Sequence, residues 1–359
     1  MLRVAVVGAN GFVGSRLVEQ WHLERRADVV PIVRRPEAAG PALRFQLDCR
    51  VADALDEREL ARALAGCDAV VHAAAGPRRL VTQSPASVVR AAARAGVGTV
   101  IYLSSMAVHA WQARPGTDEA SPLPRRQPLP YNRWKARGEE ALRRTCLESG
   151  TQFVILRPGI VYGPRSQWIA GFADCLVDGG AYVVAGGRGV CNAIYVDNLV
   201  HAVDLALHED EAMGETFLVS DDEAITWRML YEPVCRALGH SWDAVADLAP
   251  RAPRRTSRER LLELKENRVA RRALDRAPQA LRNPIRRLTA VAETPHGVPL
   301  RPPLETSLLQ TCNYRFPTTK AHRVLGFEPP VPFDEACRRT VAWLSFAGYP
   351  VDTFTQEAA

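Results

Sequence analysis

Short apolar runs alternate with longer amphipathic stretches in the first half of the chain. The apolar runs predict buried strands at residues 3–7, 29–33, 43–47, 67–75 and 99–103. Apolar residues at helical spacing predict helices through Leu17 to Trp21, over 56–65, over 85–95 and from residue 131. Because strands that alternate with helices are typical of parallel sheets, we expect an α/β protein with a doubly wound Rossmann-type sheet.

The first strand runs directly into a glycine-rich turn, Gly8-Ala9-Asn10-Gly11-Phe12-Val13-Gly14. Its glycines permit a tight turn, a close approach to a pyrophosphate and close packing of the next helix on the sheet. The free N–H groups and the positive dipole end of that helix attract phosphate. Because the turn joins a strand to a helix, the sequence predicts a dinucleotide site here.

The second strand ends at Val33, Arg34 and Arg35. NAD-binding folds usually carry an acidic residue at this place for the adenosine ribose hydroxyls, whereas an arginine accommodates a 2′-phosphate. We therefore expect NADP(H) as cofactor, with NAD(H) as the alternative. The third predicted strand ends at Asp48, which either reaches the adenine edge or caps a turn.

Small residues follow the fourth apolar run. Ala73 and Ala74 leave room for a cofactor backbone, although a close sheet-to-loop turn needs small residues equally. His72 is interpreted as a core histidine. The fifth strand ends at Ser104 and Ser105, at the edge where open α/β sheets carry their chemistry.

Tyr131 and Lys135 lie four residues apart at the start of a predicted helix, so their side chains share one face. A free phenol is a poor proton donor at neutral pH, because its pKa lies near ~10. An ammonium group one turn away stabilises the phenolate and lowers this pKa. The spacing therefore suits a proton-transfer pair.

Composition sets limits on the class of protein. The chain has 359 residues, of which 47% are hydrophobic and 24% charged, as is ordinary for a soluble protein. It has no apolar run of about 18 residues and no secretory signal at its start, so a cytoplasmic location is expected. The eight cysteines lack metal-ligand spacing and are interpreted as reduced thiols, with no metal site.

The net charge of +6 is concentrated in residues 251–287, which contain thirteen Lys/Arg and four Asp/Glu. Interleaved leucines predict a basic amphipathic helix pair broken by Pro278 and Pro284. One interpretation is a solvated face with an apolar underside. The other is a lid over the pocket, or a contact with an anionic or lipid-linked substrate near a membrane surface. Nucleic acid is not expected as a partner, since no base-reading motif accompanies the charge.

Seven motifs resemble those of the extended short-chain dehydrogenase/reductases, the NAD-dependent epimerase/dehydratase family. They are VVGANGFVG, CDAVVHAAA, YLSSMAVHA, YNRWK, ILRPGIVYGP, CNAIYVDNLVHAVDLAL and LGFEPPVPFDEA. The resemblance covers residues 2 to about 240 and 314–345. It implies a homodimer formed through the helix that carries the tyrosine. It also implies a Rossmann domain and a smaller C-terminal substrate-binding domain, expected at 1–165 plus 193–216 and at 166–192 plus 217–345, with a basic helical insertion at about 246–312.

The same resemblance assigns the catalytic roles to Ser105, Tyr131 and Lys135, with Ser104 as the alternative to Ser105. The family asparagine is not evident, and Thr82 lies near its place. Pro158 is expected on the nicotinamide side. The complete set of expected cofactor-binding residues is Gly8, Asn10, Gly11, Phe12, Val13, Gly14, Arg34, Arg35, Asp48, Ala73, Ala74, Tyr131, Lys135, Pro158 and Ile160.

Several reactions occur within the family that the motifs resemble. Met106 and Ala107 replace the Asp-Glu pair of the sugar-nucleotide dehydratases, which argues against dehydration. Cys191 stands where many epimerases place the arginine that clamps a diphosphate, although Arg188 or the basic segment is able to substitute. The motif style is closest to the 3β-hydroxysteroid dehydrogenase and dihydroflavonol reductase branches.

We therefore expect hydride transfer between the nicotinamide and a small-molecule secondary alcohol or ketone. A nucleotide-sugar epimerase with tightly bound NAD is the first alternative. A non-catalytic NADP-binding sensor is the second, disfavoured because such sensors commonly lose the tyrosine or the lysine, and this chain keeps both.

Overall fold

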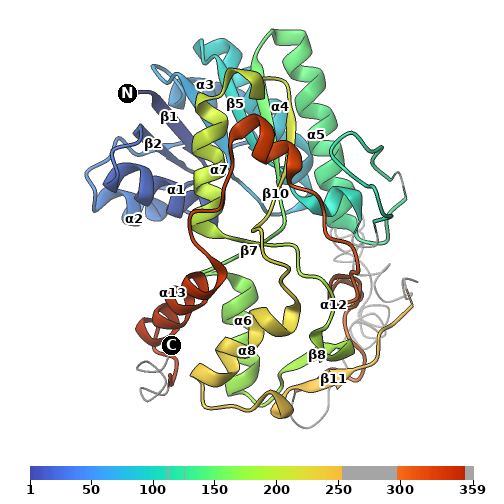
Figure 1. Ribbon diagram of the computed structural model, residues 1–359. Helices are drawn as coiled ribbons and strands as arrows, with labels where there is room; N and C mark the ends of the chain where they lie inside the picture. The colour runs from blue at the N-terminus through green and yellow to red at the C-terminus, as the bar shows by residue number, and fades with distance from the viewer. Residues whose placement is uncertain (111–112, 125, 253–296, 352–359) are drawn as a thin grey trace, which may run out of the picture.

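A seven-stranded parallel sheet is the centre of the part of the chain that the computed structural model describes, namely residues 1–110, 113–124, 126–252 and 297–351. The strands follow the order β10-β6-β5-β4-β1-β2-β3 (Figure 1). They are β1 (Arg3–Val7), β2 (Asp28–Val33), β3 (Arg50–Val51), β4 (Ala69–His72), β5 (Thr99–Leu103), β6 (Gln152–Pro158) and β10 (Thr216–Val219). The order reverses between β1 and β4, so the expected doubly wound Rossmann-type sheet is confirmed.

Helices cover both faces of this sheet. Because successive side chains of a strand point to opposite faces, Val4 and Val6 join one apolar core and Ala5 and Val7 join the other. The first core is closed by α1 (Phe12–Leu23) and α7 (Val196–His208). The second is closed by α3 (Glu57–Ala63), α4 (Arg78–Ala95) and α5 (Pro130–Ser149).

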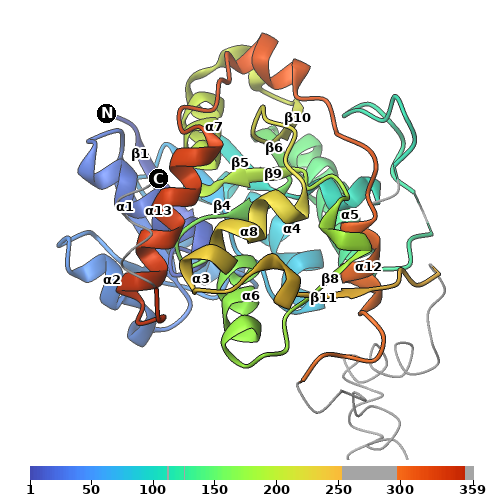
Figure 2. The ribbon, with the colours of Figure 1, turned by 60° about the horizontal axis from the view of Figure 1, so that its bottom comes forward.

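A third apolar core lies beyond the carboxyl edge of the sheet, in the lower half of Figure 1. There β7 (Ile160–Tyr162) pairs with β9 (Ala193–Tyr195), and β8 (Tyr182–Val184) pairs with β11 (Ala246–Leu248). Residues of α6 (Gln167–Val177), α8 (Trp227–Ala237), α12 (Leu304–Gln310) and α13 (Phe333–Phe346) complete it. Figure 1 shows α6, α8 and α13 below the sheet, and in Figure 2 this part of the chain comes forward.

Segments from the second half of the chain return to the main sheet. The expected domain boundary at residue 216 falls at the first residue of β10, which pairs with β6. A π-helical turn, Ala321–Leu325, and the following Phe327 pack into the core under α7. The sheet and the core that packs on it therefore contain residues from both halves of the sequence.

The prediction of a third strand over residues 43–47 is wrong. Residues Gly40–Leu43 form the short helix α2, and β3 is the two-residue strand Arg50–Val51, paired with Ile32 and Val33. The alternating Leu43, Phe45 and Leu47 imitate a strand, but Leu43 is 55% exposed and the Phe45 ring packs on His22. The third strand therefore lies several residues closer to the C-terminus than predicted.

Helix α4 begins at Arg78, earlier than the predicted start near Pro85. Proline in a helix interior removes one hydrogen bond, here the one that the Val81 carbonyl would accept. That carbonyl faces Gly138 of α5, where a β-carbon would lie 2.6 Å from the oxygen. The glycine lets the two helices pack closely, and the burial of Val81 and Pro85 offsets the lost hydrogen bond.

Three sequence expectations concern features outside the central sheet. From residue 253 to residue 287, the basic segment lies outside the described residues. None of the described helices has the length and apolarity needed to cross a membrane. All eight cysteines are free thiols, and five of them are buried.

Candidate active site

A cavity of about 930 Å³ opens at the carboxyl edge of the sheet, at the point where the strand order reverses. Ligands of open α/β sheets bind at this switch point. Of the expected cofactor-binding residues, the cavity is lined by Gly8, Asn10, Gly11, Phe12, Val13, Arg34, Arg35, Ala73, Ala74, Tyr131, Lys135, Pro158 and Ile160. The fold therefore brings together residues that lie up to 152 positions apart in the sequence, from Gly8 to Ile160.

The glycine-rich turn has the geometry of a phosphate cradle. Gly8 has φ +91°, and a β-carbon there would lie 2.8 Å from the backbone of Ala74. A β-carbon on Gly14 would lie 2.2 Å from the Gly8 carbonyl oxygen, so this glycine lets α1 approach the turn. No side chain caps the first turn of α1 at Gly11, which leaves its N–H groups directed at the cavity. These residues fit a dinucleotide pyrophosphate.

Arg34 and Arg35 line the cavity beyond the end of β2, together with Asp53. Neither arginine forms an ion pair with another described residue. The assignment of Asp48 to the cofactor site is not supported. Its carboxylate lies outside the cavity, accepting hydrogen bonds from Arg3 at 2.7 Å and from Arg50 at 2.7 and 3.0 Å. Asp53 takes its place because the third strand ends later than the sequence indicated.

His72, the last residue of β4, is a core histidine, as expected. His72 Nε2 lies 2.8 Å from Ser84 Oγ, and burial lowers the His72 pKa to about 3, so the ring stays neutral. Thr82 does not line the cavity; its hydroxyl donates to the Arg78 carbonyl within α4. Leu80 of the same helix lines the cavity instead.

Ser104 and Ser105 both reach the cavity, but their hydroxyl groups differ. The Ser104 hydroxyl donates to the buried Glu139 carboxylate and is thereby engaged in the interior. Ser105 lies at the start of a short 3-10 turn, where its oxygen accepts the Ala107 N–H at 3.2 Å. Its proton has no acceptor among the described residues, so Ser105 is the serine equipped to donate to a ligand.

Tyr131 and Lys135 share the cavity face of α5, as their spacing predicted. Lys135 Nζ donates to the Leu103 carbonyl at 2.8 Å, and burial lowers the Lys135 pKa to about 8. The expected lowering of the tyrosine pKa is wrong for this structure. Burial and the Glu305 carboxylate raise the pKa of Tyr131 to about 12, so the phenol keeps its proton near neutrality.

Beneath the cavity, Arg157 forms a buried bidentate ion pair with Glu139, at 2.7 and 3.0 Å. Both side chains are less than 5% exposed. Arg157 also donates to His109 Nε2 at 2.8 Å. This network joins β6 to α5 and holds Ser104, so Arg157 has a structural role.

Two further side chains that the motifs emphasised are also structural. The Tyr162 hydroxyl donates to the buried Asp221 carboxylate at 3.0 Å. Trp134 is partly buried on α5 and does not line the cavity. Met106 is fully buried, and Ala107, which lines the cavity, has no acidic side chain.

Arg165 is a cavity residue that the sequence analysis missed. It follows Pro164 of the quoted motif by one position and has the rare backbone φ of +71°. Its guanidinium donates to the Ser15 hydroxyl at 2.9 Å, in the first turn of α1. The Arg165 cation therefore lies beside the phosphate cradle. In the sequence, only its position next to the motif could have indicated that it lines the cavity.

Glu305 was missed as well, and the sequence contains no signal for it. It comes from the first turn of α12 and lines the cavity facing Tyr131, whose pKa it raises. Burial also raises the pKa of Glu305 itself. Neither Arg188 nor Cys191 lines the cavity, so neither is placed to clamp a diphosphate there.

Comparisons with known proteins place this geometry in a family. Residues 4–220 match the model of the NAD-dependent epimerase/dehydratase family. A 3β-hydroxysteroid dehydrogenase/decarboxylase of Arabidopsis thaliana is 25% identical, over 94% of this chain and 78% of that protein. An N-acetyl-α-D-glucosaminyl-diphospho-ditrans,octacis-undecaprenol 4-epimerase of Escherichia coli O157:H7 is 26% identical, over 66% of this chain and 72% of that protein.

Among solved structures, a dTDP-glucose 4,6-dehydratase of Streptomyces venezuelae with bound NAD has the same fold. The TM-score is 0.70 at 22% identity, and the match covers 96% of this chain and 97% of that chain. The family match extends over more than half of the sequence and includes the glycine turn, the serines and the tyrosine–lysine pair. The protein is thus a member of the NAD-dependent epimerase/dehydratase family, the extended short-chain dehydrogenase/reductase oxidoreductases.

Proposed function

We propose that this protein reduces a ketone, or oxidises a secondary alcohol, with NADP(H) as the preferred cofactor. The convergence of Ser105, Tyr131 and Lys135 on one cavity with the phosphate cradle carries the proposal. The bound nicotinamide supplies or accepts the hydride. The protein side chains supply the proton and hold the substrate oxygen.

Tyr131 is the proton carrier in this proposal. Its high pKa keeps the phenol protonated near neutrality, ready to donate to a developing alkoxide oxygen. Ser105 donates a hydrogen bond to the same oxygen and fixes its position. Lys135, anchored at the end of β5, provides positive charge beside the reacting groups while it remains an ammonium.

The cofactor is held by residues at both ends of the cavity. The N–H groups at the start of α1 and the Arg165 guanidinium suit the pyrophosphate. Arg34 and Arg35, without ion-pair partners among the described residues, suit a 2′-phosphate on the adenosine ribose. These arginines support NADP(H) over NAD(H).

The epimerase alternative differs in what happens to the cofactor, because an epimerase returns the hydride and keeps its NAD. The test is to denature the purified protein, measure released nicotinamide, and then follow consumption of added NADPH or NADH with cyclohexanone and related ketones. We expect a site largely empty of cofactor and net consumption of NADPH. Stoichiometric NAD, released only on denaturation, with no net consumption of added cofactor would instead support the epimerase.

A further inference from the structure

A second hollow of about 160 Å³ adjoins the reaction cavity, between α6, β8, α8 and α12. We call it the aromatic recess. It shares Gln167, Trp168 and Leu309 with the lining of the reaction cavity. Because the two hollows share these lining residues, they lie next to one another.

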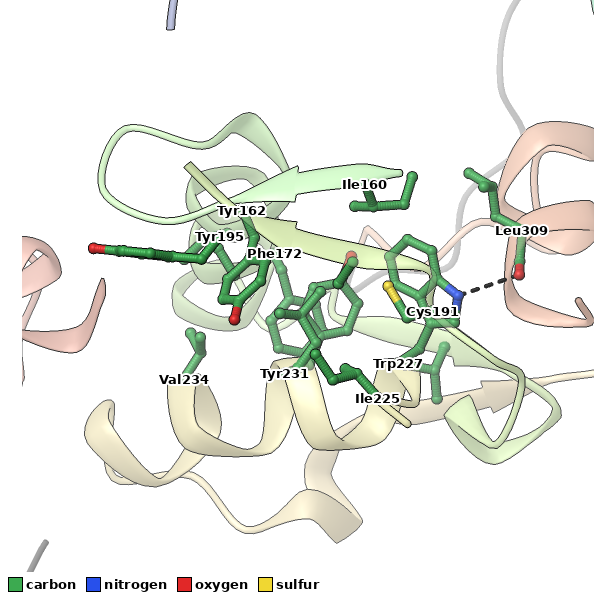
Figure 3. Packing of buried hydrophobic residues seen from close by; sticks show 14 of the residues in the cluster. Ile160, Tyr162, Phe172, Cys191, Tyr195, Ile225, Trp227, Tyr231, Val234 and Leu309 are labelled. Atoms are coloured by element: carbon green, nitrogen blue, oxygen red, sulfur yellow. Dashed lines mark hydrogen bonds between the residues drawn. The ribbon is translucent and has the colours of Figure 1, made fainter. Parts of the chain in front are cut away.

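Five described aromatic residues line the aromatic recess, and four of their rings pack in pairs. Phe172 and Tyr231 stack at 4.0 Å with an interplanar angle of 6°, and Trp168 meets Trp227 edge-on at 5.6 Å. Figure 3 shows Phe172, Tyr231 and Trp227 packed side by side below β7 and β9. Three of the rings are nearly fully buried, which fixes the shape of the wall before any ligand binds.

Two polar groups of these walls already have protein partners. Trp227 Nε1 donates to the Leu309 carbonyl at 3.2 Å, as Figure 3 shows. The Gln310 side-chain oxygen accepts the Val184 N–H at 2.6 Å. No described residue that lines the recess is charged at neutral pH. A ligand here gains burial of apolar surface against the aromatic walls.

A carboxylate, and no cation, borders the recess along α12 among the described residues. Glu305 lies next to the recess residue Thr306 in α12 and lines the reaction cavity. The cations among the described cavity residues lie elsewhere: Lys135 is bonded at the end of β5, Arg165 at the start of α1, and Arg34 and Arg35 follow β2. A diphosphate entering the recess would face a carboxylate in a partly desolvated site.

We propose that the aromatic recess binds an uncharged, ring-bearing part of the substrate, and that the substrate is an apolar cyclic alcohol or ketone and no nucleoside-diphosphate sugar. The proposal rests on the hydride transfer proposed above. The volume of the recess agrees with this proposal, because an apolar cavity of ~150 Å³ accommodates one benzene-sized ring. Filling the recess gains free energy because the rigid aromatic walls need no rearrangement.

Gly171 of α6 allows the recess to be filled by substitution. It lines the recess, and the nearest neighbour of an added β-carbon is the flexible Gln167 amide at 3.2 Å. Gly171→Leu therefore adds four carbons toward the recess. Val177→Phe adds four carbons to the same helix at an exposed position outside it and is the matched control.

The experiment compares binding of cyclohexanone, 2-decalone and UDP-glucose by calorimetry, with and without oxidised cofactor. The ketones cannot react with oxidised cofactor, and UDP-glucose, whose hydroxyl carbons can donate a hydride, is compared without cofactor, so binding is read independently of turnover. In wild type and Val177→Phe we expect 2-decalone to bind at least about tenfold more tightly than cyclohexanone, because its second ring is buried. We expect the difference to disappear in Gly171→Leu, and UDP-glucose to bind more weakly than either ketone.

Tighter binding of UDP-glucose than of both ketones overturns the proposal, as does equal affinity for the two ketones in wild type. An unchanged preference for 2-decalone in Gly171→Leu overturns it too. If that variant does not fold, the wild-type comparison still decides. Recess-dependent binding of 2-decalone without any NADPH consumption would leave the recess assignment standing and refute the proposed function. NADPH consumption with no ring-size preference would support the proposed function and refute the recess assignment.

Discussion

Four cationic side chains line the reaction cavity, and their environments are of three kinds. Arg34 and Arg35 form no ion pair with described residues, Arg165 is bonded to Ser15, and Lys135 is buried against the Leu103 carbonyl. Because a charge interacts most strongly with the ligand group beside it, these positions divide the work on the cofactor. We propose that Arg34 binds the adenosine end and Arg165 the pyrophosphate.

Arg34→Ala is expected to weaken NADPH binding about tenfold and to change NADH binding by less than about twofold. The reason is that only NADPH carries the 2′-phosphate, and hydrogen bonds to charged groups contribute roughly 1.5–3 kcal/mol. Titration of tryptophan fluorescence with each cofactor measures both affinities in the same variant. Equal losses for the two cofactors would mean that the 2′-phosphate is read elsewhere.

Arg165→Ala is expected to weaken NADPH and NADH by the same factor, about tenfold, since both cofactors contain the pyrophosphate. The same titration provides the measurement. Arg144→Ala, at an exposed position of α5 that does not line the cavity, is the matched control and should bind both cofactors as wild type does. A selective loss of NADPH alone in Arg165→Ala would contradict the assignment.

The Lys135 pKa predicts a pH dependence. Burial lowers it to about 8, so the ammonium is present below this pH and is lost above it, whereas Tyr131, with a pKa of about 12, stays protonated throughout. We therefore expect kcat/KM for ketone reduction to fall above about pH 8. Lys135→Arg keeps the charge and should move this decline to higher pH. A decline at the same pH in both proteins would assign it to another group.

At the scale of elements, the site depends on how α5 is held against the sheet. The pair of Glu139 with Arg157 joins α5 to β6, and Gly138 lets α5 pack against the proline-containing α4. The sequence predicted α5 from the spacing of Tyr131 and Lys135. It did not predict the ion pair, because nothing in a linear pattern indicates that two charged residues will be buried together.

Removing one partner of this pair tests its contribution to stability. Glu139→Gln leaves the Arg157 guanidinium buried without a counter-charge, so we expect the free energy of unfolding to fall by about 3–5 kcal/mol. The exposed neighbour provides the control: Glu140→Gln should change it by less than about 0.5 kcal/mol. Urea denaturation measures both. Equal stability of the two variants would show that the pair is dispensable.

At the scale of the whole molecule, the sequence predicted those parts of the site that arise from local pattern. The glycine turn, the serines after β5 and the tyrosine–lysine pair each follow a strand or begin a helix, and the cavity contains all of them. Asp53 was missed because an alternating apolar stretch imitated a strand. Glu305 and the aromatic recess arise from contacts between distant segments, which no local pattern encodes.

The rate of Tyr131→Phe tests the central claim most directly, because the substitution removes the phenolic proton and keeps the ring. We expect the rate of NADPH-dependent ketone reduction to fall by about 10²–10⁴-fold, the usual contribution of general acid catalysis, with cofactor affinity within a few-fold of wild type. Tyr349→Phe, which removes a hydroxyl bonded to Asp174 away from the cavity, should keep the wild-type rate. A wild-type rate in Tyr131→Phe would contradict the role of Tyr131 as proton carrier.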